Sequence, residues 1–273
     1  MAIIGMGRVG IRSIAAPTSY TTRTTAFAAA TGITDTTILN ALNTFDTGLI
    51  SNGLDSKMKA LYPFVGGTAT THKFNFMDAR DLDVAFRLQF FGGGTFSSTG
   101  YQPNGTNAYA DTFLNASTQL TNNNYHLSHF SRTQKTNENG CDIGVSSSGN
   151  DLGLYQYYNT LGKIYVCGSY PTQSITASDT NTLGMLIGSR TSQTSAKMFM
   201  NNIQKGTTLT TINGFSLPNG NFFISANDGG SFPNNYSSKE CAFSSIGDAL
   251  TDGEATTFYN LVQAMQTTLS RQV

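Results

Sequence analysis

The spacing of glycines at the start of the chain is the first pattern that could carry chemistry. Gly5, Gly7 and Gly10 fit G-x-G-x-x-G, the spacing with which a backbone turn approaches a dinucleotide pyrophosphate at the start of a helix. That turn belongs to alternating strands and helices. Here Pro17 and a Ser/Thr-rich run follow within ten residues, and no such alternation comes after them. We therefore predict no bound nucleotide and no other cofactor.

The histidines are the next candidates for catalysis or metal binding. His126 and His129 fall in a predicted strand, where side chains three positions apart point to opposite faces, so they cannot easily share a metal ion. His72 stands alone, and no G-x-S-x-G motif marks a nucleophilic serine. We predict that all three histidines are structural.

Three carboxylates form the one candidate metal site. Asp78, Asp81 and Asp83 are closely spaced ahead of a predicted strand, where carboxylates can bind Ca²⁺. Their spacing does not match an EF-hand loop. The same side chains can equally cap a turn or pair with Arg80 and Arg87, and the sequence leaves both interpretations open.

Glycan hydrolysis by paired carboxylates is not indicated. The glutamates are Glu138, Glu240 and Glu254, and Glu254 fits a helix cap. No strand carries the E-x-D-x-E pattern of laminarinase-like enzymes. We therefore predict that the protein is not an enzyme.

Charge in this sequence is sparse and balanced. Charged residues make up 12% of the chain, with 16 basic against 16 acidic side chains, so neither nucleic acid nor an anionic membrane is a predicted partner. The content of 38% hydrophobic and 11% aromatic residues argues against disorder. Cys141, Cys167 and Cys241 are odd in number and widely spaced, which predicts buried, reduced thiols.

The sequence shows no segment for membrane insertion or export. No apolar run is long enough to span a bilayer. The first residues lack the basic region of a signal peptide, and glycines interrupt their apolar character. We expect a protein that stays inside a cell until lysis.

Helical periodicity appears at both ends of the predicted domain. Residues 34–62 read as helical in two parts: a first helix capped at Thr34 or Asp35 and closed by Gly48 and Asn52-Gly53, and a short second helix from Asp55 to Tyr62. The C-terminal helix, at about 251–270, begins with the capping box Thr251/Glu254. Its apolar stripe consists of Phe258, Leu261, Val262, Met265 and Leu269.

Between the helices the pattern is one of short strands separated by turns. The strongest predicted strand is Val84–Phe91, and others are expected near 125–130, 152–158, 163–167, 184–189, 196–200, 221–226 and 240–246. Asn-Gly pairs at 104–105, 139–140, 213–214 and 219–220 mark turns. Strands at this spacing without intervening helices predict an all-β sandwich or jelly roll.

Residues 1–31 differ from the rest and are predicted to form an extended N-terminal docking arm on a domain of residues 32–273. The segment is rich in Gly, Ala and Thr and has no acidic residue, so it cannot bury enough apolar surface to fold alone. Val9 and Ile11 alternate with polar or small residues, as in a strand that adds to a partner's sheet edge. The predicted docking residues are Ile3, Ile4, Met6, Arg8, Val9, Ile11 and Arg12.

A family resemblance is carried by the C-terminal stretch KECAFSSIGDALTDGEA, which continues through FYNLVQAMQTTLSRQV. It extends to MKALYPFVGGTATTHKFNFMDARDLDVAFRL, YQPNGTNAYADTFLN and LGMLIGSRTSQTSAKMFMNN, roughly residues 55–273. In these segments the chain resembles tailed-bacteriophage virion proteins that have a concanavalin A-like, laminin-G-like jelly roll. The resemblance implies that fold and a place on the tail, its fibres or the capsid surface. It implies no individual functional residue.

Related jelly rolls often bind glycans through aromatic and amide side chains. The candidates for glycan contact, by composition only, are Tyr101, Tyr109, Tyr157 and Tyr158, with Tyr125, Tyr155, Tyr170 and Phe232 as further aromatic residues. For each of them, packing in the core is the competing interpretation.

The main functional prediction is a structural component of a phage particle, a capsid decoration, head fibre or tail appendage anchored through residues 1–31. Its predicted partners are other virion proteins and further copies of itself, and its predicted location is the virion, assembled in the host cytoplasm. The alternative is a module that recognises host surface glycans. A glycan-cleaving enzyme is the third hypothesis.

Overall fold

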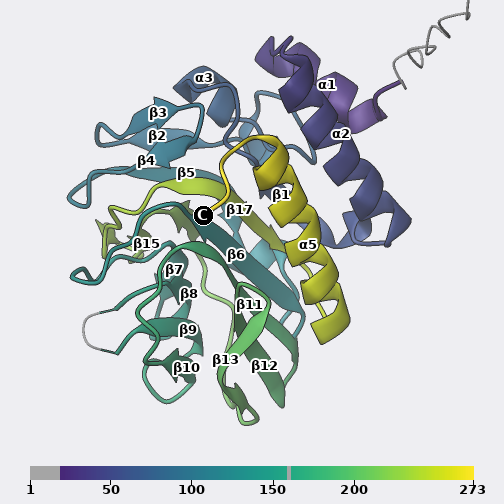
Figure 1. Cartoon of the computed structure of the whole chain (residues 1–273). Coiled ribbons are helices and arrows are strands. Elements are labelled where there is room, and N and C mark those ends of the chain that lie inside the picture. Colours follow the sequence, from purple (N-terminus) through teal and green to yellow (C-terminus); the bar gives the residue numbers. More distant parts are fainter. Residues whose placement is uncertain (1–18, 159–160) are drawn as a thin grey trace, which may run out of the picture.

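Two β-sheets pack face to face, and helices cover the outer face of one of them (Figure 1). The computed structural model describes residues 19–158 and 161–273. The first sheet has the strand order β13-β12-β11-β6-β17-β4-β3, with β1 also paired to β17. The second has the order β10-β9-β8-β7-β14-β5-β2, with the hairpin β15–β16 beside β7. All pairs are antiparallel except β15 with β7.

The strands are short and the longer helices lie near the chain ends. The first sheet contains β1 (Met58–Tyr62), β3 (Thr95–Ser97), β4 (Gly100–Gln102), β6 (Tyr125–Ser131), β11 (Gly184–Ser192), β12 (Ser195–Met200), β13 (Ile203–Leu209) and β17 (Cys241–Gly247). The second contains β2 (Gln89–Phe91), β5 (Tyr109–Asn115), β7 (Ile143–Ser147), β8 (Asn150–Tyr155), β9 (Lys163–Gly168), β10 (Ser174–Ala177), β14 (Asn221–Ile224), β15 (Asn227–Asp228) and β16 (Pro233–Asn234). The helices are α1 (Thr22–Thr31), α2 (Thr36–Ser51), α3 (Ala69–His72), α4 (Ala116–Gln119) and α5 (Asp252–Thr268), with 3₁₀ turns η1 (Asp55–Lys57) and η2 (Asp83–Ala85).

The central strands of the first sheet are buried on both faces. Every residue of β6 and of β17 is buried. Leu127 of β6 points into the apolar cluster between the sheets, whereas Phe130 points into a second cluster under the helices. Alternate residues of β5, in contrast, are half-exposed. The second sheet is thus covered on one face only, as in a sandwich whose outer face meets solvent.

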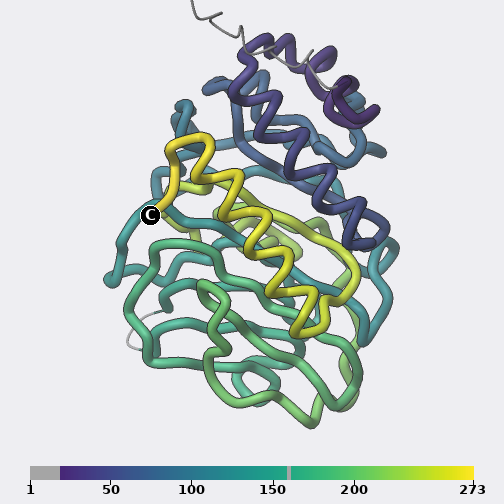
Figure 2. The backbone as a smooth tube through the Cα atoms, turned by 45° about the vertical axis from the view of Figure 1, so that its right-hand side comes forward, coloured from purple at the N-terminus to yellow at the C-terminus, as the bar shows by residue number. Residues whose placement is uncertain are grey.

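Helix α5 covers the first sheet beside α2, and both views show the two helices next to each other (Figures 1 and 2). The predicted capping box is present: Thr251 accepts from the Glu254 amide, and Glu254 accepts from the Thr251 amide. Phe258 is fully buried, and its ring lies 6.4 Å from Phe45 of α2 and 5.9 Å from Phe243 of β17. The predicted C-terminal helix and its apolar stripe are confirmed.

The predicted short helix at 55–62 is wrong. Only the turn η1 is helical there, and β1 follows and pairs with β17. A bulge between Met58 and Ala60 places Met58 and Leu61 on the helix side of the sheet, while Ala60 faces the other sheet. The bulge therefore gives two apolar residues the three-residue spacing of a helix turn.

The strand predicted at 84–91 is largely wrong as well. The turn η2 occupies its start, Phe86 adopts a left-handed φ of 59°, and only β2 remains of it. The Phe86 carbonyl accepts a hydrogen bond from the Tyr62 hydroxyl at 2.7 Å. Val84 is 74% exposed. A local turn fixed by a tertiary hydrogen bond thus overrides the β-propensity of this segment.

Most other predicted strands coincide with observed ones. Those near 125–130, 163–167, 184–189, 196–200 and 240–246 correspond to β6, β9, β11, β12 and β17. β8 and β14 overlap the predictions at 152–158 and 221–226 but end earlier, and β5, β7, β10 and β13 were not predicted. The four Asn-Gly pairs lie in loops between strands, but none of them forms a tight hairpin turn. The hairpin of β7 and β8, for example, turns at Ser148-Gly149.

Part of the predicted docking arm belongs to the domain. Residues 22–31 form α1, in which Thr24 is fully buried and Phe27 is 1% exposed. The Phe27 ring lies 5.4 Å from that of Phe76, within the cluster under the helices. The predicted boundary between residues 31 and 32 is therefore wrong, because the folded domain includes α1.

The proposed docking residues and the glycine motif lie outside the described residues. These are Ile3, Ile4, Met6, Arg8, Val9, Ile11 and Arg12, together with Gly5, Gly7 and Gly10. Across residues 19–158 and 161–273, no helix combines the length and apolar character that a membrane span requires.

The packing of α5 makes a direct prediction about stability. Replacing Phe258 with Ala removes a ring that contacts both α2 and β17, and we expect a loss of about 3–5 kcal/mol in the free energy of unfolding. Urea unfolding followed by circular dichroism measures this loss. Asn260→Ala, on the exposed side of the same helix, is the control and should change stability little. An equal effect of the two substitutions would contradict the docking of α5.

Candidate functional site

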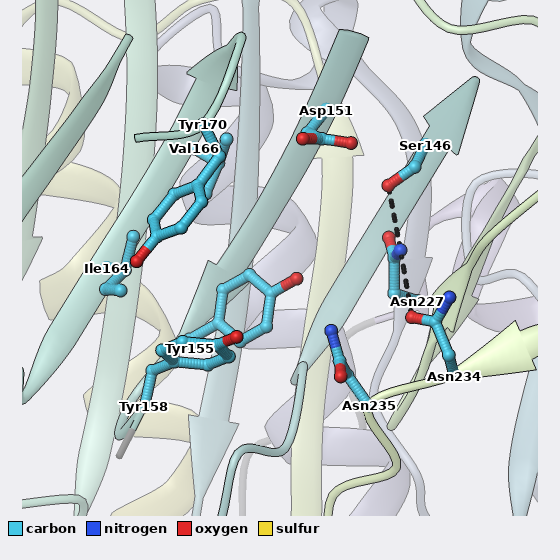
Figure 3. Close-up of a pocket in the computed structure, with 10 residues that line it drawn as sticks. All are labelled: Ser146, Asp151, Tyr155, Tyr158, Ile164, Val166, Tyr170, Asn227, Asn234 and Asn235. Atoms are coloured by element: carbon cyan, nitrogen blue, oxygen red, sulfur yellow. Dashed lines mark hydrogen bonds between the residues drawn. The ribbon is translucent and has the colours of Figure 1, made fainter. Parts of the chain in front are cut away.

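A pocket of about 220 Å³ opens on the outer face of the second sheet. It lies over β7, β8 and β9, and the hairpin β15–β16 flanks it (Figure 3). The lining residues are Ser146, Asp151, Tyr155, Tyr158, Ile164, Val166, Tyr170, Asn227, Asn234 and Asn235.

The pleat of the strands places these side chains outward. In β8, Leu152 and Leu154 point into the core between the sheets, so Asp151 and Tyr155 point to the outer face. β9 alternates in the same way, with Tyr165 inward between the lining residues Ile164 and Val166. The outward-facing side chains of β8 and β9 therefore form the floor of the pocket.

One wall of the pocket is aromatic. The rings of Tyr155 and Tyr158 meet edge to face at 5.2 Å, and those of Tyr158 and Tyr170 at 6.2 Å. Tyr170 is 40% exposed, whereas Tyr155 is nearly buried. Burial, reinforced by the nearby Cys141 thiol, raises the pKa of Tyr155 well above its usual value. The Tyr155 hydroxyl therefore stays protonated and can donate a hydrogen bond.

The opposite wall consists of amides. Asn227 donates from Nδ2 to Ser146 Oγ at 2.8 Å and to Asn234 Oδ1 at 3.2 Å (Figure 3). β15 reaches this position because it pairs in parallel with β7, opposite Gly144 and Val145. The two walls face each other across the pocket in the close-up view (Figure 3).

Asp151 stands between the two walls and carries the one charge among the described residues that line the pocket (Figure 3). Within residues 19–158 and 161–273, its carboxylate has no hydrogen bond or salt bridge to a side chain or amide. Both of its oxygens are therefore available as acceptors. Aromatic rings with convergent amide and carboxylate groups suit a small, hydroxyl-rich ligand that also has apolar C–H surface.

The structure separates the predicted tyrosine contacts into different environments. Tyr158 lines the pocket, together with Tyr155 and Tyr170, whereas Tyr157 is half-buried beside it and does not. Tyr101 is fully buried and stacks on Phe96 at 5.3 Å, so its predicted contact with a glycan is wrong. Burial was the competing interpretation, and it holds for Tyr101.

Other candidate aromatic residues lie elsewhere. Tyr109 belongs to a separate aromatic cluster on the same outer face, where it lies 4.8 Å from Phe91 and 4.7 Å from Phe223. Tyr125 is fully buried and accepts a hydrogen bond from Arg190. Phe232 is 69% exposed in the turn of the β15–β16 hairpin.

The polar half of the pocket was not predicted. Ser146, Asp151, Asn227, Asn234 and Asn235 come from segments that are far apart in sequence. The one local signal for them is the clustering of Asn, Ser and Gly at 225–237, which indicates no particular site. Their convergence depends on the register of β15 against β7.

The carboxylates considered for calcium pair with cations instead. Asp78 binds Arg80, Asp81 pairs with Lys73, and Asp83 accepts from Arg87 at 2.7 Å. In the part of the chain that the structure describes, no cluster of three or more metal-ligating side chains is found. Of the two interpretations that the sequence left open for these aspartates, the structure shows the salt bridges.

The comparisons with known proteins support the fold. No protein-family model matches this chain, and no curated protein matches it significantly. Among solved structures, domain 4 of AbnA, an extracellular arabinanase from Geobacillus stearothermophilus in complex with arabinotriose, is 15% identical with a TM-score of 0.50; the match covers 74% of this chain and 98% of that one.

Two larger proteins contain a similar fold. A mutant of Trypanosoma rangeli sialidase is 12% identical with a TM-score of 0.51, over 85% of this chain and 38% of that one. A structure of botulinum neurotoxin type C, whose cell entry depends on two ganglioside molecules, is 11% identical with a TM-score of 0.51, over 78% and 53% of the two chains. This chain thus spans about a third to a half of those two proteins.

At these identities the similarity is one of fold. It confirms the concanavalin A-like, lectin-like β-sandwich that the sequence predicts. None of the three comparisons supplies a link to a phage particle.

The histidines lie away from the pocket and are buried. His126 and His129 point to opposite faces of β6, as predicted: His126 bonds to Ser245 Oγ at 3.0 Å under α5, whereas His129 lies near Asp142, the residue just before β7. Burial lowers the pKa of both to about 4, and that of His72, beside Phe64, to about 3.

These pKa shifts predict that acid destabilises the fold. In the unfolded chain each histidine has a pKa near 6.5, so that state takes up protons first, and stability falls as the pH drops from about 6.5 towards 4. At pH 5 each histidine should cost about 2 kcal/mol relative to pH 7.5. Urea unfolding of His72→Phe should show a pH dependence smaller by that amount. An unchanged pH dependence would contradict the burial of a neutral imidazole.

Proposed function

We propose that the protein is a glycan-binding module and that the pocket over β7, β8 and β9 is its binding site. The observation that carries the proposal is the pairing of an aromatic wall with an amide wall across a carboxylate that has no side-chain or amide partner among the described residues. Sugars present C–H faces that pack on aromatic rings and hydroxyls that bond to amides and carboxylates. The similarity to an arabinanase domain in complex with arabinotriose, and to a ganglioside-dependent toxin, supports it.

We propose that this module binds glycans without cleaving them. Glycosidases of the common kind place two carboxyl groups on either side of the scissile bond. Asp151 is the one carboxylate among the described residues that line the pocket. The Glu138 carboxylate is bound to Lys239 and Ser238. These contacts support the sequence-based expectation that the protein is not an enzyme.

The aromatic wall gives the first test of binding. Tyr158→Ala should weaken binding of a glycan found on an array by roughly five- to thirtyfold, because loss of a stacked ring removes about 1–2 kcal/mol. Tyr158→Phe keeps the ring and should retain most of the affinity. Isothermal titration calorimetry with the same glycan measures both.

The control for this test is Tyr259→Ala on α5, at the far side of the first sheet from the pocket. It removes the same side chain at a distance and should leave the affinity unchanged. If Tyr158→Ala binds as tightly as the wild type while its melting temperature is normal, the pocket is not the glycan site.

We further propose that this module is carried on a phage particle. The support is the sequence resemblance of roughly residues 55–273 to tailed-phage virion proteins and the composition of the first residues, which lack acidic side chains. In this proposal the protein is located in the virion, assembled in the host cytoplasm, and the candidate docking residues from Ile3 to Arg12 attach it to other virion proteins. Glycan binding would then serve attachment to the host surface.

This second proposal predicts that docking and folding separate at the start of α1. Deleting residues 2–18 should leave the melting temperature unchanged and abolish incorporation into particles. Phe27→Ala removes a buried ring of α1. It should lower the melting temperature but leave incorporation of the folded protein intact. Normal incorporation of the deletion variant would show that docking lies elsewhere.

A further inference from the structure

We infer that the pocket selects neutral glycans with adjacent free hydroxyls and excludes acidic ones, and that Asp151 sets this preference. The inference rests on the proposed glycan-binding function of the same pocket. Its starting point is the charge of the lining: one carboxylate, three asparagine amides, one serine and no cation among the described residues.

A site for an acidic sugar needs a positive group that faces the ligand. Arginine is the usual partner for a carboxylate or sulfate, because its planar group forms two parallel hydrogen bonds. The lysines to consider are Lys163, Lys239 and Lys135, which lie on segments that carry or adjoin lining residues of the pocket. Each of them is directed elsewhere.

Lys163 belongs to β9, next to the lining residue Ile164, but it points to the opposite face. Its side chain is fully buried, and its ammonium group bonds to the Asn181 carbonyl and lies 3.9 Å from Asp179. A strand residue adjacent to an outward side chain points inward. Lys163 therefore cannot reach a ligand on the outer face.

Lys239 is equally unavailable. It is fully buried, bonds to Glu138 and lies 3.1 Å from Asp142. Lys135 lines a separate hollow on the other side of Asn235, together with Glu138. No described cation is thus left to balance the charge of Asp151 inside the pocket.

The position of Asp151 suits a diol. Its two oxygens have no bond to a side chain or amide in the described part of the chain, and the amide wall stands opposite the aromatic wall beside it (Figure 3). A carboxylate with two free oxygens can accept hydrogen bonds from two hydroxyls on neighbouring carbon atoms, and such charge-assisted bonds are stronger than neutral ones. An acidic group in the same place would instead meet a like charge in a partly enclosed, low-dielectric site.

The experiment uses the full chain and matched pairs of oligosaccharides that differ by one sialic acid, uronic acid or sulfate. A glycan array selects the neutral ligand, and titration calorimetry compares it with its acidic counterpart. We expect the neutral glycan to bind at least about tenfold more tightly. Raising the salt concentration should narrow that gap, because salt screens repulsion.

Substitution then assigns the preference to Asp151. Asp151→Asn should weaken binding of the neutral glycan by about tenfold and reduce the discrimination against its acidic counterpart. Asp252→Asn, which makes the same change in net charge at the exposed start of α5, should alter neither.

The outcomes distinguish this inference from the proposed function. Glycan binding that depends on Tyr158 but favours acidic or amine-bearing sugars would overturn the neutral preference and leave the binding function standing. Discrimination that survives Asp151→Asn would overturn the role of Asp151. Absence of any glycan binding, or binding insensitive to Tyr158→Ala, would remove the proposed function and this inference with it.

Discussion

Burial of the central strands of the first sheet on both faces is the constraint on which the rest of this structure depends. β6 and β17 lie between the core shared with the second sheet and the cluster shared with α1, α2 and α5. Strands in such a position cannot present polar groups to a ligand, because each unpaired polar group would cost free energy. The second sheet has an outer face that α1, α2 and α5 do not cover, and the pocket lies there. The helices thus determine indirectly which face of the sandwich carries the pocket.

The amide wall of that pocket depends on buried charge. Lys239 follows the segment that carries Asn235, and its ammonium lies between Asp142 and Glu138. Burial alone would lower the pKa of Lys239, but the two carboxylates outweigh it and raise that pKa. Ser237 adds a hydrogen bond to Asp142 at 3.1 Å. Removing one member would leave a buried charge unpaired, so this cluster holds residues 235–239 firmly against the start of β7.

The sequence predicts those elements whose signals lie within the element itself. It does not predict the elements whose structure depends on pairing with a distant segment. The capping box at Thr251 and the stripe of α5 lie within one helix, so both could be predicted. β1 could not, because its bulge gives Met58 and Leu61 helical spacing and its identity depends on β17, about 180 residues later. The sequence names the tyrosines of the pocket as candidates from composition alone. It does not predict that the asparagines lie opposite them, because that placement depends on the parallel pairing of β15 with β7.

Aromatic residues on the open face are not equally suited to bind a sugar, and ring geometry separates them. Tyr109 lies between Phe91 and Phe223 with interplanar angles of 14° and 35°, so neighbouring rings cover its faces. Tyr155, Tyr158 and Tyr170 instead meet at 81° and 66°. Edge-to-face packing stabilises these rings while leaving ring surface free for a ligand. The same sheet therefore packs its aromatic rings against one another at one end and arranges them edge to face around the pocket at the other.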